Sequence, residues 1–366
     1  MKYTVIVALL LIAIFGLFVL HKKGKAASNP YLLGPHELAD FASLEPIDAH
    51  THIATLEPQL LAIFRTFHLR AVDILYVDNT DSFRNAIEPQ KKDALASITS
   101  SENRLLLCTT FDPYQITAPH FSGTVIAQLN DDFAKGALAV KIWKNIGMQI
   151  VDKNGKYVMP DDERLSPIYR DIARHNKTLV THSADPDHDW GVPQPWDVSN
   201  QYLIQHPQWN MSGRQGAPSK DAIIEAVDHL LAQNRDLRVI GAHFGSMETH
   251  LDQLAVRLDQ NPNFAVDTAG RIRFLYALPS ADVRAFFLKY QDRILYGTDF
   301  RFEPRTNASA VQLYENQLTH EWLYLSTDRA FEYQGRRIQG INLPREVLKK
   351  VYHDNAVKWF PGINQH

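Results

Sequence analysis

Short apolar runs recur along the chain from residue 47 onward and alternate with segments of helical periodicity. The runs are rich in Val, Ile and Leu, as expected for strands that are buried on both faces. We predict eight strands, at residues 47–53, 70–77, 104–111, 137–143, 178–183, 238–243, 263–267 and 293–299. Apolar residues at helical spacing predict the connecting helices, at residues 56–68, 84–100, 124–135, 164–175, 219–233, 248–260 and 280–290.

This alternation of strands and helices predicts an α/β fold with a parallel sheet. Eight strand–helix units over roughly 300 residues predict a right-handed (β/α)8 TIM barrel. An open doubly wound sheet has the same rhythm, but such a sheet usually carries a Gly-rich phosphate turn after an early strand. The sequence contains neither that turn nor a Walker motif. The C-terminal residues 343–360 are predicted to form a helix that closes the barrel.

The N-terminal segment has a different character. Residues from Tyr3 to Leu20 carry no charge and are almost wholly apolar, and a lysine-rich stretch follows them. As a helix, this segment would span roughly 27 Å, about the thickness of a bilayer core. We favour an uncleaved single-pass membrane anchor at residues 1–28, outside the barrel, over a cleaved signal peptide, and a catalytic domain at residues 29–366. Export to the periplasm or the extracellular space is the predicted location, and the cytoplasmic face is the alternative, since the lysines favour it.

Composition excludes some functions and leaves others open. A chain of 366 residues that is 45% hydrophobic suits one large globular domain. The net charge of −3 gives no electrostatic reason to expect nucleic acid as a partner. The single cysteine, Cys108, excludes an intrachain disulfide and leaves the redox compartment open. A homo-oligomer is compatible with the sequence.

Polar side chains stand where several of the predicted strands end. Asp48, His50 and His52 alternate with apolar residues and should share one face of the first strand. Two imidazoles at positions i and i+2 can reach one divalent cation, and neutral imidazole suits zinc, copper, iron and nickel. Four further strand ends carry Lys141, His182, His243 and Asp299. Because TIM barrels do their chemistry at this face, the set predicts a metal-dependent active site.

Two long connections follow the fourth and fifth strands, at residues 144–162 and 184–220. In a barrel they would lie over the active site. Trp190, Trp196 and Trp209 in the second connection favour a packed lid that contacts the substrate.

The order and spacing of these motifs resemble the metal-dependent amidohydrolase superfamily, in its amidohydrolase family 2 branch. The resemblance spans roughly residues 45–360 and is carried by Asp48–His52, Val180–His182, Gly241–Gly245, Leu295–Asp299 and Tyr352–Ala356. It implies a (β/α)8 barrel that activates water with a divalent metal.

The resemblance also implies a role for each matching residue. His50, His52 and His182 would be metal ligands, and Asp299 would bind the metal and take a proton from the attacking water. His243 would stand beside the metal and polarise the substrate or transfer a proton. One Zn²⁺ is the favoured cofactor, with manganese or iron as alternatives.

Lys141 has two interpretations. In binuclear members of the superfamily, a lysine at the end of the fourth strand is carboxylated and bridges two metals. A cationic Lys141 would instead hold a substrate carboxylate or pair with Asp48. Further candidates for contacts with the substrate are Lys144, Asn145, Arg271 and Trp190.

We therefore predict a metal-dependent hydrolase that cleaves an ester, lactone or amide bond in a small polar molecule. The first alternative is a metal-dependent non-oxidative decarboxylase of an aromatic or related carboxylic acid, for which a basic, aromatic pocket would speak. The second alternative is a catalytically inactive, membrane-tethered binding protein. No residue of the expected ligand set is substituted, which speaks against it.

Overall fold

A computed structural model describes residues 34–77, 87–191, 203–204, 206–302 and 308–365. Its centre is a nine-stranded sheet in the order β8-β7-β6-β5-β4-β3-β2-β1-β9, in which every strand pair is parallel. The strands are Ile47–Ile53 (β1), Arg70–Ile74 (β2), Leu105–Thr110 (β3), Ala139–Ile142 (β4), Thr178–Thr181 (β5), Arg238–Gly241 (β6), Phe264–Asp267 (β7), Ile294–Leu295 (β8) and Phe300–Phe302 (β9). The eight predicted strand positions are confirmed.

The sheet closes on itself through two short strands: β8 lies within the last predicted strand, residues 293–299, and β9 follows directly after it. β8 pairs with β7, and β9 pairs with β1. Between them, the backbone N–H of Ala49 donates to Tyr296 O at 2.8 Å, and that of Asp299 donates to His50 O at 2.8 Å. The fold is therefore TIM-barrel-like.

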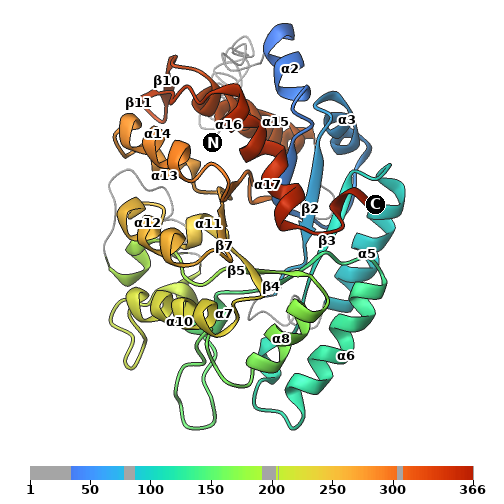
Figure 1. Ribbon diagram of the computed structural model, residues 1–366, viewed down its shortest axis with the longest axis vertical. Coiled ribbons are helices and arrows are strands. Elements are labelled where there is room, and N and C mark those ends of the chain that lie inside the picture. The colour runs from blue at the N-terminus through green and yellow to red at the C-terminus, as the bar shows by residue number, and fades with distance from the viewer. Residues whose placement is uncertain (1–33, 78–86, 192–202, 205, 303–307, 366) are drawn as a thin grey trace, which may run out of the picture.

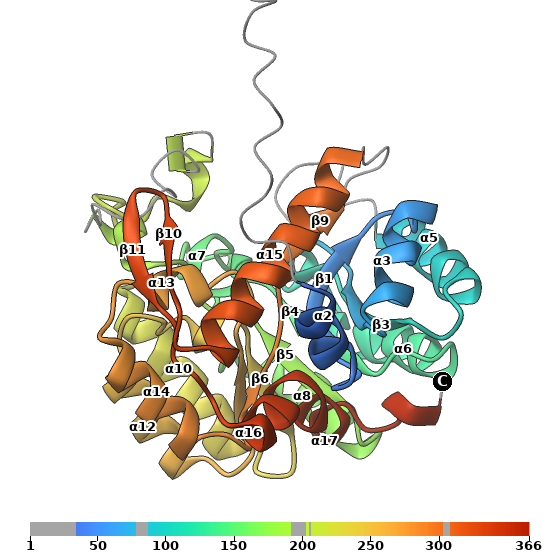
Figure 2. The same ribbon diagram turned by 90° about the horizontal axis from the view of Figure 1, so that it is seen from above.

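Helices surround the sheet. Figures 1 and 2 show α3, α5 and α6 on one side of the strands and α10, α12 and α14 on the other. The longer helices are Pro35–Ala42 (α2), Pro58–Thr66 (α3), Ile87–Ser100 (α5), Phe121–Ala134 (α6), Ser166–Arg174 (α8), Lys220–Gln233 (α10), Leu251–Gln260 (α12), Ser280–Lys289 (α14) and Ala308–Ser326 (α15). Shorter segments are Asn145–Met148 (α7), Ala242–Gly245 (α11), Ile272–Leu275 (α13), Arg345–Lys349 (α16) and Asn355–Trp359 (α17), with a π-helical turn at Lys350–Asp354 and 3₁₀ turns at Pro113–Gln115, Asp187–Trp190, Pro207–Trp209 and Ile363–Gln365.

Side chains alternate between the interior of the sheet and the helices outside it. One buried apolar cluster takes residues from all eight strands β1–β8 and lies inside the closed sheet. Trp359, Phe360 and Ile363 from the C-terminal segment join this cluster and close that end. Alternate strand residues, such as Val140 and Val266, pack in the cluster that includes the surrounding helices. The apolar interior thus fills one end of the barrel and leaves the other end to polar side chains.

A β-bulge corrects one prediction about β1. The pairing of β1 with β2 shifts register between Asp48 and Thr51. As a result, Ile47 and Ala49 face the apolar interior, and Asp48 does not share a face with His50 and His52. The Asp48 carboxylate instead accepts hydrogen bonds from Tyr314 Oη at 2.9 Å and from Thr298 Oγ1 at 2.6 Å. Asp48 therefore ties β1 to the segment between β8 and β9 and to α15.

The predicted membrane anchor is not supported, and we correct the predicted localisation. Within the part of the chain that the structure describes, no helix combines the length and apolar character needed to cross a membrane. Residues 1–28 themselves lie outside the described residues. We therefore withdraw the single-pass anchor, the predicted signal and the predicted export that depended on them.

Two elements after β9 were not predicted. α15 packs its buried residues Tyr314, Leu318 and Trp322 into the outer core. The antiparallel hairpin of β10 (Ala330–Tyr333) and β11 (Arg336–Gln339) follows it. Both views place the hairpin beside α13 (Figures 1 and 2), where Tyr276 packs against Phe331 and Tyr333.

Candidate active site

A cavity of about 410 Å³ opens at the carboxyl ends of the strands. Four of the predicted metal-binding and catalytic residues line it: His52, His182, His243 and Asp299. The other lining residues are Tyr76, Trp143, Lys144, Asp185, Pro186, His188, Asp189, Arg271, Arg273 and Arg301. A volume of this size suits a small molecule.

His50, His52 and Asp299 form a group that could hold a metal ion. Asp299 Oδ1 lies 3.5 Å from His50 Nε2 and 3.3 Å from His52 Nε2. One ligand atom from each of the three residues lies within 4.8 Å of the other two. The structure thus brings together three of the four predicted ligands.

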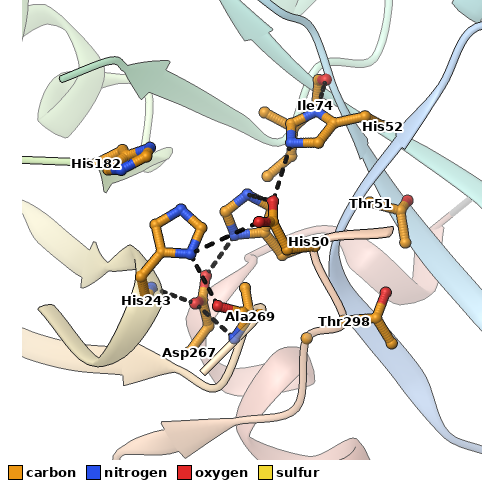
Figure 3. Close-up of polar contacts among 12 residues, drawn as sticks. His50, Thr51, His52, Ile74, His182, His243, Asp267, Ala269 and Thr298 are labelled. Atoms are coloured by element: carbon orange, nitrogen blue, oxygen red, sulfur yellow. Dashed lines mark hydrogen bonds and ion pairs between the residues drawn. The ribbon is translucent and has the colours of Figure 1, made fainter. Parts of the chain in front are cut away.

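The second nitrogen of each imidazole is held by an acceptor outside the cavity (Figure 3). His50 Nδ1 lies 2.8 Å from Asp267 Oδ2, and His52 Nδ1 lies 2.7 Å from Ile74 O. Because the carbonyl acts only as an acceptor and the carboxylate as an anion, Nδ1 of each ring carries the proton and Nε2 keeps a lone pair. Two lone pairs beside an ionised carboxylate match the donors that a divalent cation requires. The residues present therefore fit a divalent metal ion.

His182, the fourth predicted ligand, is oriented differently. Its Nε2 lies 3.1 Å from Asp185 Oδ1, and its buried Nδ1 has no hydrogen-bond partner. Burial lowers the pKa of His182 to about 3, although Asp185 acts in the opposite direction. A neutral ring with an unpaired buried nitrogen is suited to metal binding through Nδ1. Figure 3 shows His182 apart from His50 and His52, and its role as a ligand stays a prediction.

Asp299 has an unusual backbone conformation. Its φ of 59° lies in the left-handed region, and this residue separates β8 from β9. Such conformations are costly for non-glycine residues and concentrate at functional sites. Two residues earlier, a Cβ on Gly297 would lie 3.0 Å from the Cβ of His50, so glycine suits this close approach of the two segments.

The carboxyl group of Asp299 is ionised. Burial would raise its pKa, but the contacts with His52 and His50 and the charge of Lys141 outweigh burial and hold the pKa below its usual range. The side chain is 32% exposed, more than the imidazoles around it, because it faces the cavity. Asp299 is therefore a carboxylate that can accept a proton from a molecule in the cavity.

The ring of His243 lies next to that of His50. The two ring centroids are 5.0 Å apart, and His243 Nδ1 lies 2.8 Å from Ala269 O. Its Nδ1 therefore donates to the backbone and leaves Nε2 for other contacts. Burial, followed by the charges of neighbouring groups, lowers the pKa of His243 well below its usual value.

Lys141 lies fully buried beneath the cavity. Its Nζ donates to His50 Nε2 at 2.9 Å, and it lies 4.7 Å from the centroid of Trp143. Burial lowers its pKa to about 8. The predicted pairing with Asp48 is not seen, since the Asp48 carboxylate bonds to Thr298, Tyr314 and the backbone N–H of His50. Carboxylation of Lys141 stays a prediction.

The four candidate substrate contacts divide into two pairs. Lys144 and Arg271 line the cavity. Asn145 and Trp190 are not among the lining residues: the Asn145 amide donates to Tyr114 Oη, and the Trp190 indole donates to Pro218 O at 3.0 Å. We do not retain these two as substrate contacts.

The two long connections pack against each other beside the cavity. Met148 of the first connection lies in one apolar cluster with Trp209 and Met211 of the second, and Trp190 packs against that cluster. Lys144 Nζ lies 4.2 Å from the centroid of the Trp209 ring. These contacts support the predicted packed lid, although Trp196 lies outside the described residues.

Sequence reasoning missed several residues of the site. Asp267 and Asp185 hold imidazoles, and Tyr76, Arg273 and Arg301 line the cavity. Asp267 could have been found, because it ends a predicted strand as the histidines do. Arg301 follows Asp299 by two residues and could have been found by the same alternation.

The family comparison identifies residues 146–362 as a match to the family model described as Amidohydrolase. The match includes His182, His243 and Asp299 and begins after β4. His50, His52 and Lys141 precede it. Among curated proteins, no sequence matches this chain.

Solved structures support the fold. A 2,6-dihydroxybenzoate decarboxylase from Rhizobium is 13% identical with a TM-score of 0.51, and the alignment covers 86% of this chain and 98% of that one. An amidohydrolase II is 16% identical with a TM-score of 0.51, covering 86% and 99%. A 4-oxalomesaconate hydratase from Rhodopseudomonas palustris is 11% identical with a TM-score of 0.50, covering 87% and 97%.

Proposed function

Since the chain belongs to the amidohydrolase family, a family of metal-dependent enzymes that act on small molecules, we propose that it is a hydrolase of an ester, lactone or amide bond. The observation that carries this proposal is the position of Asp299. Its ionised carboxylate touches the cavity and lies within 3.5 Å of the Nε2 atoms of His50 and His52. A general base belongs at this point, between a cation site and the space for substrate.

The proposed mechanism gives each side chain one task. His50, His52 and Asp299, with His182 as the predicted fourth ligand, would hold one Zn²⁺, with manganese or iron as alternatives. When bound, the cation supplies Lewis acidity that activates water and polarises the bond under attack. Asp299 accepts the proton of the attacking water. His243 stabilises the developing negative charge or protonates the leaving group.

Cationic side chains in the cavity wall support an anionic substrate. Arg271 is only 6% exposed, and its buried Nε has no hydrogen-bond partner. Its closest carboxylate, Glu248 Oε2, lies 3.7 Å away and is also without a hydrogen-bond partner. Arg271 and Glu248 thus form a buried ion pair that is longer than a hydrogen bond, and the guanidinium, which lines the cavity, can bind a carboxylate in bidentate fashion. We propose that Arg271 holds a carboxylate of the substrate.

A second candidate reaction is decarboxylation of an aromatic carboxylic acid, and one observation favours it. Tyr76 and Trp143 form an aromatic wall with ring centroids 4.4 Å apart, and Trp143 lies 5.4 Å from the His52 ring. Arg301 stands over Tyr76 at 4.6 Å. This wall would accept a flat ring whose carboxylate meets an arginine. A decarboxylase and a hydratase both share the fold, so the fold leaves the reaction open.

The test is product analysis with the full chain, purified without chelators and loaded with Zn²⁺. Lactones, esters and amides, each with and without a free carboxylate, are offered in H₂¹⁸O, and aryl acids are offered in parallel. Hydrolysis places ¹⁸O in the product. Release of carbon dioxide from aryl acids, without turnover of the first panel, would select the second candidate instead.

Two variants make the test specific. Asp299→Asn should abolish turnover, while Asp328→Asn, at an exposed aspartate, should leave it unchanged. Arg271→Met should raise KM about 10–100-fold for substrates with a carboxylate, the expected loss for a hydrogen bond to a charged group. It should change KM little for their neutral amides. Equal effects on both would contradict the role of Arg271.

A further inference from the structure

The carboxylate of Asp267, at the end of β7, contacts both sides of the site (Figure 3). Its Oδ2 lies 2.8 Å from His50 Nδ1. Its Oδ1 accepts the backbone N–H groups of His243 at 2.8 Å and of Ala269 at 3.1 Å. Asp267 is only 1% exposed and is not among the residues that line the cavity. It therefore acts on the site only through other residues.

The contact with His50 determines which ring nitrogen is available. A buried carboxylate accepts hydrogen bonds, so the proton of the neutral imidazole stays on Nδ1 and the lone pair on Nε2 points toward Asp299 and the proposed cation. Carboxylates in this position also make a histidine a stronger donor to metal. Without this acceptor, the proton could move to Nε2 and block that lone pair.

The contact with His243 works through the backbone. His243 has a φ of 59°, a left-handed conformation that is costly for a non-glycine residue. Asp267 Oδ1 holds the N–H of His243 and also the N–H of Ala269. The carbonyl of Ala269 in turn accepts the hydrogen bond from His243 Nδ1 at 2.8 Å. Both ends of the hydrogen bond that orients the His243 ring are thus fixed to one carboxylate oxygen.

From these contacts, we propose that Asp267 is a positioning residue that sets the tautomers of His50 and His243 together. Cation binding on one side of the cavity and proton transfer on the other would then depend on one carboxylate. This inference rests on the proposed function, because it takes His50 as a metal ligand and His243 as the acid–base group.

Asp267→Asn is the sharpest variant to test this. The asparagine amide is neutral and has one acceptor oxygen in place of two, so both His50 Nδ1 and the two backbone N–H groups lose their carboxylate partner, and one of the two sides must also face an NH₂ donor. We expect the affinity for Zn²⁺, measured by competition with a chelator, to fall about 10–100-fold. The matched control is Asp132→Asn, which removes a buried carboxylate that bonds to Lys91 and Thr109. It should change the affinity less than about twofold, within the scatter of an uncoupled site.

The second readout is the imidazole ¹⁵N spectrum of histidine-labelled protein, with the signals of His50 and His243 assigned from His50→Gln and His243→Asn. Wild-type protein should show both rings protonated at Nδ1, and Asp267→Asn should lose that state at both. Because the wild-type spectrum does not depend on Asp267→Asn, it tests the proposal even if that variant fails to fold. A wild-type His50 protonated at Nε2, or unchanged Zn²⁺ affinity in folded Asp267→Asn, would overturn the proposal.

A third result would refute the coupling: Zn²⁺ affinity falls, but the His243 ring keeps its tautomer. Asp267 would then serve His50 alone. None of these measurements requires turnover. If Zn²⁺ affinity falls and both tautomers are lost as expected, but no bond is hydrolysed, the proposed reaction fails and the role of Asp267 stands.

Discussion

Lys141 Nζ lies 2.9 Å from His50 Nε2, which is the ring nitrogen that would bind a cation. The amine and a divalent cation would therefore compete for the same lone pair. At an effective dielectric constant of about 20, two unit charges 4 Å apart repel by about 4 kcal/mol. The environment of Lys141 opposes a charge, since burial lowers its pKa to about 8.

Lys141→Met should accordingly bind one Zn²⁺ per chain at least tenfold more tightly than wild type, since about 1.4 kcal/mol of relieved repulsion gives that factor. Elemental analysis gives the stoichiometry, and chelator competition gives the affinity. Lys91→Met is the control, because Lys91 is a buried lysine that pairs with Asp132 on the outer wall. It should lower stability without changing metal content. Two metals in wild type and one in Lys141→Met would instead identify Lys141 as a carboxylated bridge.

The role of His182 can be separated from that of another histidine in the same cavity. His182→Ala should lower metal content and activity together, because the unpaired Nδ1 of His182 is its proposed contact with the cation. His188 also lines the cavity, is buried and pairs with Asp189 at 2.8 Å, but it is not one of the predicted ligands. His188→Ala should keep the metal. Wild-type activity in His182→Ala would refute the assignment of His182 as a ligand.

His243→Asn tests the acid–base role with little disturbance. The asparagine amide can replace Nδ1 and keep the hydrogen bond to Ala269 O, while it removes Nε2. We expect full metal content and turnover reduced roughly 10²–10⁴-fold, the range for lost acid–base help. His243→Gln places its amide nearer to the position of the histidine Nε2, so it should lose the contact with Ala269. Loss of metal from His243→Asn would show that His243 is a ligand.

Much of the fold could be predicted from local patterns. Each strand is an apolar run buried on both faces, so the eight strand positions follow from the sequence alone. The rule that polar residues end such runs also located His182, His243 and Asp299. The same rule applies to Asp267, which ends β7. α15 had a readable signal as well, since Tyr314, Leu318, Trp322 and Leu325 recur at helical spacing.

Other features depend on contacts between distant segments. The bulge in β1 turns Asp48 toward Tyr314, which follows it by 266 residues. His182 turns toward Asp185, which also pairs with Lys144 from another loop. The left-handed backbone at Asp299 is stabilised by its hydrogen bond to His50 O. No local pattern of residues encodes these partners, so only the folded structure reveals them.

Glu321 on α15 makes the stability of the protein depend on pH. It is buried, and its carboxylate accepts hydrogen bonds from Tyr296 Oη at 2.7 Å and from Gln317 Nε2 at 2.9 Å. Burial raises its pKa to about 8, although both hydrogen bonds act in the opposite direction, and the charge of Asp48 adds to the increase. The ordinary value, 4.5, applies to the unfolded chain.

Between these two pKa values, the folded state binds more protons at Glu321 than the unfolded state does. The contribution of this group to the free energy of unfolding is therefore fully present below about pH 4.5 and is lost as the pH rises to about 8. Glu321→Gln cannot ionise, so its loss of stability over this interval should be smaller than that of wild type. Urea unfolding at pH 5, 7 and 9 measures the difference.

Asp48 and Asp73 also have pKa values raised by burial, to about 7, so the comparison must be between the variant and wild type at each pH. Glu346→Gln, at an exposed glutamate, should follow the wild-type slope. Parallel curves for Glu321→Gln and wild type would show that Glu321 is ionised in the folded protein across the whole interval.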